Sequence, residues 1–169
     1  QDRRWLHHAA KLLTDAGCGI KDGKRMLPSG EPLTIEFLVD EPNLEPHHLP
    51  YIRNLGILGI QASLRLVDPV QYRRRVDDRD FDIIIDRFSF SSTPGDSLRT
   101  YFSSQAARLK GSQNEAGIAD PAIDAMIDHA ITAKTRDDMI FACRALDRVF
   151  RSGRYWIPHW YKPTHWIAY

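Results

Sequence analysis

The sequence predicts an α/β fold built on a small, mostly parallel β-sheet. Three stretches have the alternation or the short apolar run that is typical of strands: residues 33–39, 61–67 and 81–88. Stretches with the apolar spacing of helices separate them, so the order is strand, helix, strand, helix, strand. Such crossovers join parallel strands and are nearly always right-handed. We therefore expect a three-stranded core, with residues 81–88 as its central strand and helices packed on its faces.

The elements of the first half follow from apolar spacing and turn residues. Residues 5–16 carry apolar side chains at helical intervals up to a glycine, and Asp22-Gly23 marks a turn. Residues 51–58 repeat the helical pattern. The next helix begins at Asp68-Pro69, because aspartate can cap the first amides and proline fits the first helical position. These features place one helix before the sheet and one in each crossover.

The second half is predicted to be helical and to end in an aromatic tail. A short helix is expected over residues 96–104, and Asp120-Pro121 begins a longer one. Thr135 and Asp138 form a capping-box pattern at the start of another. The short link between the two longer helices predicts an antiparallel pair. Residues 155–169 are rich in tryptophan and tyrosine, and their prolines limit them to an edge strand or extended chain.

Length and composition restrict the classes of protein to which the chain can belong. Its 169 residues are enough to bury a sizeable core, and we expect one domain over residues 1–169. A net charge of +1 gives no reason to expect a nucleic-acid partner. No apolar run approaches the roughly 20 residues of a membrane helix. Cys18 and Cys143 lack the spacing of metal ligands, and the sequence leaves open whether they form a disulfide. The chain begins without methionine and enters a helical pattern at once, so we interpret it as a piece of a longer protein.

The stretch after residue 85 is the candidate ligand-binding edge. The apolar run of the third strand gives way there to a polar segment rich in serine, and ligands bind past the carboxyl ends of strands in open α/β sheets. An exposed strand edge can also bind an extended peptide by adding it as another strand. The ordinary alternative is a core strand that runs into a surface loop. The candidate ligand-binding residues are Arg87, Phe88, Ser89, Phe90, Ser91, Ser92, Thr93 and Asp96, with Asn114 from a later loop.

A catalytic site is the alternative interpretation. Asp82 and Asp86 are an even number of positions apart on the predicted strand, so they share a face. A hydrolase or metal-dependent enzyme would need them to meet His159 or His165 in one pocket. The sequence shows neither the glycines of a nucleophile elbow nor the spacing of a zinc site. We therefore predict a binding protein that is not an enzyme and holds no cofactor or metal.

A third hypothesis is a protein–protein interaction domain. The aromatic stretch 155–169 would then be a surface through which this fragment dimerises or exchanges strands. Light scattering of the isolated fragment would separate this hypothesis from the other two.

Several short motifs follow one another along the chain in a characteristic order. They lie at residues 12–17 with 22–24, 54–60, 67–68 with Tyr72, 81–82, 112–121 with Asp124, 145–148 and 157–161. In this order and spacing they resemble the motifs of the family 5 extracellular solute-binding proteins. The last two segments look closest to the YejA-like branch of that family.

The resemblance implies a periplasmic protein of two lobes that closes on an oligopeptide or dipeptide and delivers it to an ABC permease in the inner membrane. The chain would be most of the C-terminal lobe, with the full-length protein secreted or lipid-anchored. Family members with a pocket for a free amine carry an acidic residue after the central strand, and that position falls at about Ser91 here. Asp96 is the nearest acid. The resemblance therefore implies a neutral, blocked or modified peptide.

Overall fold

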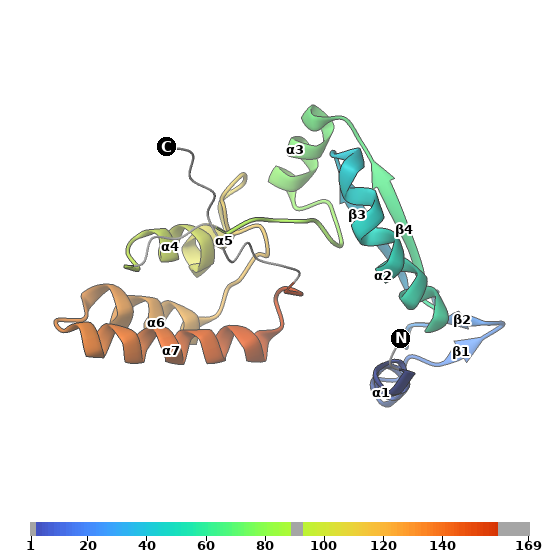
Figure 1. Ribbon diagram of the computed structural model, residues 1–169, viewed down its shortest axis with the longest axis horizontal. Coiled ribbons are helices and arrows are strands. Elements are labelled where there is room, and N and C mark those ends of the chain that lie inside the picture. The colour runs from blue at the N-terminus through green and yellow to red at the C-terminus, as the bar shows by residue number, and fades with distance from the viewer. Residues whose placement is uncertain (1–2, 89–92, 159–169) are drawn as a thin grey trace, which may run out of the picture. The chain divides into compact units, whose positions relative to one another are not determined.

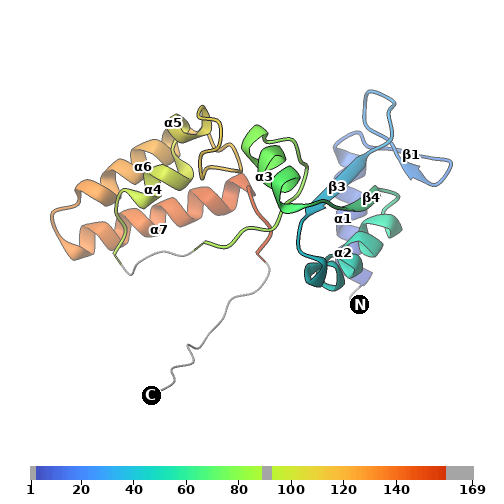
Figure 2. The ribbon, with the colours of Figure 1, turned by 90° about the horizontal axis from the view of Figure 1, so that it is seen from above.

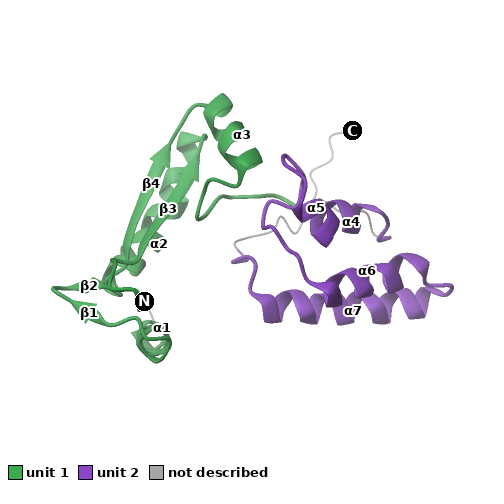
Figure 3. Ribbon diagram, turned by 180° about the vertical axis from the view of Figure 1, so that it is seen from behind, with its two compact units in different colours: residues 1–88 green, residues 89–169 purple. Residues whose placement is uncertain are grey.

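The chain folds around separate hydrophobic cores. The computed structural model describes residues 3–88 and 93–158 (Figure 1). These residues divide into unit 1, residues 1–88, and unit 2, residues 89–169 (Figure 3). Each unit has its own buried apolar clusters, so each is described by itself. Within the described residues, none of the helices has the length and apolar composition that crossing a membrane requires.

A parallel pair of strands forms the centre of unit 1. Strand β3 (Thr34–Val39) and strand β4 (Gln61–Leu66) pair in parallel along their full length. The crossover between them consists of a short 3₁₀ helix, η1 (Pro42–Leu44), and helix α2 (Glu45–Ile57). This helix begins six residues before the predicted start at Tyr51. Pro46 lies in its first turn, where a proline is well tolerated, and the helix continues through Pro50.

Helices cover both faces of this sheet. Phe37 of β3 packs with Leu55 and Leu58 from the α2 region, and helix α1 (Arg3–Asp15) adds apolar side chains to the same cluster. The next residue, Leu38, points to the opposite face, where it packs with Val76 of helix α3 (Pro69–Asp78). Asp68 caps α3, as predicted, by accepting hydrogen bonds from the first amides of the helix.

The third predicted strand is reduced to a single point of pairing. Ile83 donates to the Glu36 carbonyl at 3.1 Å and accepts from the Leu38 amide at 2.9 Å, which forms one parallel bridge on the free side of β3. The prediction of a central strand over residues 81–88 is therefore wrong, because β3 lies between β4 and Ile83. The Asp82 carboxylate accepts from the Glu36 amide at 2.8 Å, where a longer ladder would place a main-chain carbonyl.

A small hairpin precedes the sheet. Strands β1 (Ile20–Lys21) and β2 (Lys24–Arg25) pair in antiparallel fashion around the predicted Asp22-Gly23 turn. Both turn residues have positive φ angles, 51° and 76°, which is the conformation that favours the Asp-Gly sequence in tight hairpins.

Unit 2 is helical. It contains α4 (Ser97–Phe102), α5 (Ser104–Ala107), α6 (Pro121–Thr132) and α7 (Arg136–Gly153). Figures 1 and 2 show α6 and α7 side by side as an antiparallel pair, as their short link predicts. Asp120 and Thr135 cap the two helices by accepting from amides in their first turns, at 2.8 and 3.1 Å. The core of the unit lies between this pair and α4, around Phe102, Ile118, Ile123, Ile127 and Leu146.

Candidate functional site

The carboxyl ends of β3, β4 and the Ile83 bridge lie along one edge of the sheet, because all three run parallel. The chain after β3 crosses to the face covered by α2, whereas the chain after β4 crosses to the face covered by α3. Neighbouring strands that send their connections to opposite faces create the crevice in which α/β folds bind ligands. The predicted ligand-binding segment begins at this edge, four residues after Ile83.

Arg87 continues the alignment that the bridge begins. It stands four residues after Ile83, and Glu41 stands four residues after Phe37, which is the bridge partner of Ile83. The Arg87 guanidinium lies 3.8 Å from the Glu41 carboxylate. The Arg87 side chain is nevertheless 74% exposed, so it is available to a ligand. The pair shows that the segment after Ile83 keeps to the carboxyl end of β3.

The main chain beyond Ile83 leaves an open sheet edge. Ile83 uses both of its main-chain groups on β3. A further rung would require the Ile85 amide to reach β3, but in residues 3–88 neither Ile84 nor Ile85 donates a main-chain hydrogen bond. Alternate residues of a strand direct their peptide groups to opposite sides, so those of Ile84 are directed away from β3. This geometry suits the addition of another strand.

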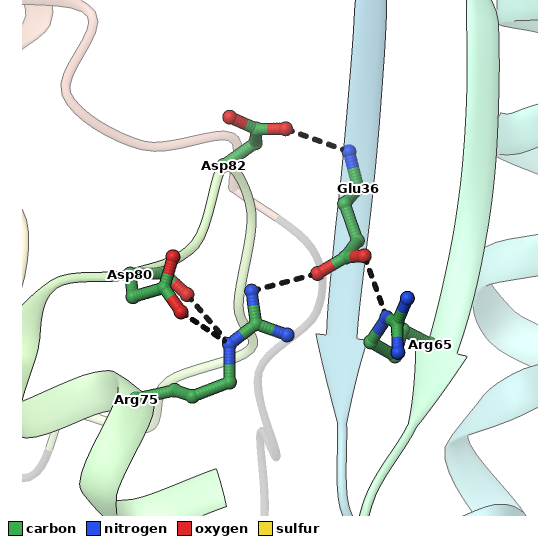
Figure 4. Close-up of polar contacts among 5 residues, drawn as sticks. All are labelled: Glu36, Arg65, Arg75, Asp80 and Asp82. Carbon is green, nitrogen blue, oxygen red and sulfur yellow. Dashed lines mark hydrogen bonds and ion pairs between the residues drawn. The ribbon is translucent and has the colours of Figure 1, made fainter.

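A network of charged side chains holds this segment against the sheet (Figure 4). Glu36 of β3 accepts from Arg65 of β4 at 2.8 Å and pairs with Arg75 of α3 at 2.8 Å. Arg75 also donates to the Asp80 carboxylate at 2.9 Å and to the Asp80 carbonyl at 3.0 Å. Asp82 completes the network through the Glu36 amide. The network therefore links both strands, α3 and the chain that enters the Ile83 bridge.

The charges of this network stabilise one another. Partial burial by itself raises the pKa of Glu36, but hydrogen bonds from Arg75 and Arg65 outweigh it and hold that pKa below the ordinary 4.5. Burial by itself lowers the pKa of Arg75. The bonds of Arg75 to Glu36 and Asp80 act in the opposite direction and outweigh burial, so the pKa of Arg75 is raised above its ordinary value. Both groups stay charged at neutral pH. Their polar atoms are directed at each other, so we assign them to holding the segment in place.

The remaining predicted site residues divide between the two units. Arg87 and Phe88 belong to unit 1, and both are exposed. Thr93 and Asp96 belong to unit 2 and are also exposed, with Asp96 at 3.8 Å from Arg99 just before α4. The predicted contacts Ser89, Phe90, Ser91 and Ser92 lie outside the described residues.

Asn114 has a structural role within unit 2. It is 1% exposed, and its amide nitrogen donates to the carbonyls of Ser103 and Ile118 at 3.0 and 2.9 Å. Its amide oxygen accepts from the Ile118 amide at 2.9 Å. These bonds close the loop before α6. The structure does not test whether Asn114 contacts a ligand, so that role stays a prediction.

The residues of the catalytic alternative have other contacts. Asp82 accepts from the Glu36 amide, and Asp86 accepts from the amide of Arg87 at 2.6 Å. His159 and His165 lie outside the described residues. Among residues 3–88 and 93–158, no group of three His, Cys, Asp or Glu side chains could hold a metal ion. Cys18 and Cys143 are both free thiols, and burial raises the pKa of Cys143.

Sequence reasoning missed the roles of Glu36 and Glu41. A signal for Glu36 was present, because a carboxylate in the middle of an apolar strand needs a nearby cation. Arg65 alternates outward on the following strand and was the natural partner. Glu41 could not be found in this way, since its pairing with Arg87 depends on the register between β3 and a segment distant in sequence.

Comparisons with known proteins agree with this architecture. No protein-family profile matches the chain. The chain is 41% identical over 166 residues to the probable peptide-binding protein YejA of Agrobacterium fabrum, a match that covers 97% of this chain. It is 36% identical over 167 residues to the peptidoglycan-binding protein YepA of the same bacterium, with 99% of this chain covered. The chain spans only 27% of the length of each of these relatives.

A solved structure shows the same fold. It is a periplasmic oligopeptide-binding protein of an ABC transporter from Thermotoga maritima with bound mannohexaose. The TM-score is 0.81 at 21% identity, over 93% of this chain and 31% of that one. The fold is therefore that of part of a periplasmic solute-binding protein. The sequence identities confirm the resemblance of the motifs, since over nearly its whole length the chain is similar to one part of proteins named YejA and YepA.

Proposed function

We propose that this chain is most of the C-terminal lobe of the substrate-binding component of an ABC importer. The ligand is a peptide or peptide-like solute, bound in the periplasm by main-chain pairing in a cleft between this lobe and a second lobe outside the chain. The full-length protein delivers the ligand to an ABC permease in the inner membrane and catalyses no reaction. The names of the relatives, which include a peptide-binding and a peptidoglycan-binding protein, support this class of ligand.

The observation that carries the proposal is the open edge after Ile83. The N–H and C=O groups of Ile84 are directed away from β3 by the alternation of the chain and, in residues 3–88, have no main-chain partner. An extended ligand that pairs with them gains affinity without its side chains being read, which suits a protein that imports peptides of varied sequence. Phe88, which is exposed at the end of this segment, supplies an apolar wall.

An acidic side chain near the edge after Ile83 would favour a ligand with a free amino terminus. The resemblance implies that family members with an amine pocket carry an acid at a position that falls at about Ser91 in this chain. We therefore propose that the ligand is neutral, blocked or modified at its amino end. Peptides with free and with acetylated amino termini, titrated calorimetrically into the full-length protein, test this. Stronger binding of the free amines would contradict it.

Methylation of the ligand backbone tests the mode of binding. Replacing one N–H of a bound peptide by N–CH₃ removes a donor and leaves every side chain in place. Main-chain pairing predicts that methylation at alternate residues weakens binding about tenfold or more, while methylation at the intervening residues has a small effect. Uniform tolerance of methylation would refute the pairing, and failure of every peptide to bind would refute the ligand class.

A matched pair of variants tests the position of the site. Phe88→Ala should weaken peptide binding, because it removes the apolar wall beside the edge. Val70→Ala is the control, since Val70 is an exposed apolar side chain on α3, 81% exposed against 42% for Phe88. Equal affinities of the two variants would place the ligand elsewhere.

A further inference from the structure

Helix α7 carries a narrow exposed strip of aromatic and basic side chains. The strip consists of Phe141, Arg144, Arg148 and Arg151, which follow one another at intervals of three and four residues. Side chains at these intervals lie on one face of an α-helix. All four are exposed, and Phe141 is 65% exposed although it is apolar. We call these four residues the α7 strip.

The strip lies directly opposite the buried face of the same helix. The side chains that pack into the core of unit 2 are those of Ala142, Cys143, Leu146, Val149 and Phe150. Along the helix they alternate with the strip in the regular manner of an amphipathic helix. The strip is therefore held in a fixed geometry by a well-packed core.

Among residues 3–88 and 93–158, few carboxylates neutralise the charges of the strip. Arg151 pairs with Asp147 at 2.9 Å, but that pair is largely exposed to water. For Arg144 and Arg148, no carboxylate lies within ion-pair distance in the part of the chain that the structure describes. Phe141 places an exposed aromatic ring on the same face as these cations.

We propose that the α7 strip docks onto an acidic segment of a partner protein. Arginine forms bidentate hydrogen bonds with carboxylates, and Phe141 provides an apolar anchor beside them. An anionic membrane surface fits the strip less well. A helix that binds a bilayer inserts a broad apolar face, and the apolar face of α7 is already packed in the core. The α7 strip belongs to unit 2, whereas the proposed peptide-binding edge belongs to unit 1.

The probe for this proposal is a pair of synthetic helical peptides. One carries Glu at three positions spaced like the arginines and a Leu beside them, and the other carries Gln in place of Glu. Fluorescence anisotropy would follow binding of each to the full-length protein at an ionic strength of about 0.02 M and again at about 0.5 M. We expect binding of the Glu peptide only, and loss of that binding in high salt.

The strip variant is the triple substitution Arg144→Gln, Arg148→Gln and Arg151→Gln. Its control is Arg53→Gln, Arg74→Gln and Arg108→Gln, which removes the same charge from three exposed arginines elsewhere. The strip variant should bind the Glu peptide at least about tenfold more weakly, and the control should bind it nearly as the parent does. Equal loss in both variants would reduce the effect to net charge and overturn the proposal.

Vesicles of phosphatidylglycerol provide the second arm. The proposal predicts that the parent and the strip variant sediment equally with these vesicles. Strip-dependent sedimentation without strip-dependent peptide binding would assign the strip to a membrane and overturn docking to a protein. Phe141→Ser should weaken binding of the Glu peptide at low ionic strength, because it removes the apolar part of the contact. What binding remains should still be lost in high salt, since the arginines are unchanged.

Discussion

Glu36 shows how a single residue can tie the ligand edge to the sheet. Its carboxylate lies between Arg65 and Arg75, and its main-chain amide donates a hydrogen bond to the Asp82 carboxylate. Each of these contacts comes from a different part of unit 1. The charge of Glu36 therefore matters to the fold, although no ligand needs to touch it.

The pKa of Glu36 leads to a prediction about acid stability. Because its hydrogen bonds to Arg75 and Arg65 hold the pKa below 4.5 in the folded protein, the stabilisation is present above that pH. It is lost as the pH falls through the lower, folded-state pKa. The free energy of unfolding of Glu36→Gln, measured against pH, should therefore fall below that of the parent at neutral pH and approach it in acid.

Glu31→Gln is the control for this measurement. Glu31 is exposed and has no ion pair among the described residues. Its variant should follow the parent curve at every pH. A constant difference between Glu36→Gln and the parent down to strongly acidic pH would contradict the role of the charge.

Arg25 is a buried cation that is stabilised by neutral acceptors. It is 2% exposed, and it donates to the carbonyls of Leu58 and Cys18 at 3.0 and 2.9 Å. Leu58 directly follows α2, and Cys18 stands three residues after the end of α1, so both carbonyls belong to the turns that leave these helices. Arg25→Met should lower the free energy of unfolding by about 2–4 kcal/mol, because it leaves buried carbonyls without donors.

Denaturant unfolding would measure this effect, with Arg53→Met as the exposed counterpart. The exposed variant should change stability by less than about 0.5 kcal/mol. Arg25→Lys should recover only part of the loss, since an ammonium cannot reproduce the planar donor geometry of a guanidinium. Similar stability of Arg25→Met and Arg53→Met would rule out this role.

At the scale of the element, the segment around Ile83 is a strand cut short by its own side chain. The Asp82 carboxylate accepts a hydrogen bond from the Glu36 amide at 2.8 Å, so main-chain pairing with β3 begins only at Ile83. Between Ile83 and Phe88 the chain stays at the carboxyl end of β3, and these described residues form no further main-chain pair with it. A short, firmly placed edge with free peptide groups is what strand addition by a ligand needs.

Two substitutions at Asp82 test this view of the element. Asp82→Ala leaves the Glu36 amide without its acceptor and should destabilise the protein by about 1–2 kcal/mol. Asp82→Asn keeps an acceptor oxygen and should cost less. Thermal unfolding of both variants decides between this and a purely electrostatic role, in which the asparagine variant would be as unstable as the alanine variant.

At the scale of the whole molecule, the chain holds one side of the proposed cleft. It spans 27% of the length of its relatives, so a ligand bound to this edge would have only part of its surface covered. Affinity depends on the contacts made by both walls of a closing cleft.

We therefore expect the isolated chain to fold but to bind peptides weakly or not at all. Calorimetry against a peptide library measures this directly, and the full-length protein is the positive control. Micromolar or tighter binding by the isolated chain would refute the need for a second wall.

Much of the fold was predictable because it depends on local patterns. Three residues predicted the start of a helix, and the structure shows each of them capping one: Asp68, Asp120 and Thr135. The alternation of residues 33–39 and 61–67 likewise predicted β3 and β4. The candidate site was predictable only as a segment, since the sequence places Arg87 after an apolar run without showing what it meets.

The sequence by itself determined the class of fold, the places of β3, β4 and the longer helices, and the resemblance to solute-binding proteins. These follow from spacing, capping residues and short motifs, which act over a few positions of the chain. Only the tertiary structure decided that β3 is the central strand, that Ile83 makes a single bridge, and that Glu36 joins Arg65 to Arg75. Those contacts join residues far apart in sequence, so they arise only when the packing of α3 and the sheet has set the register between them.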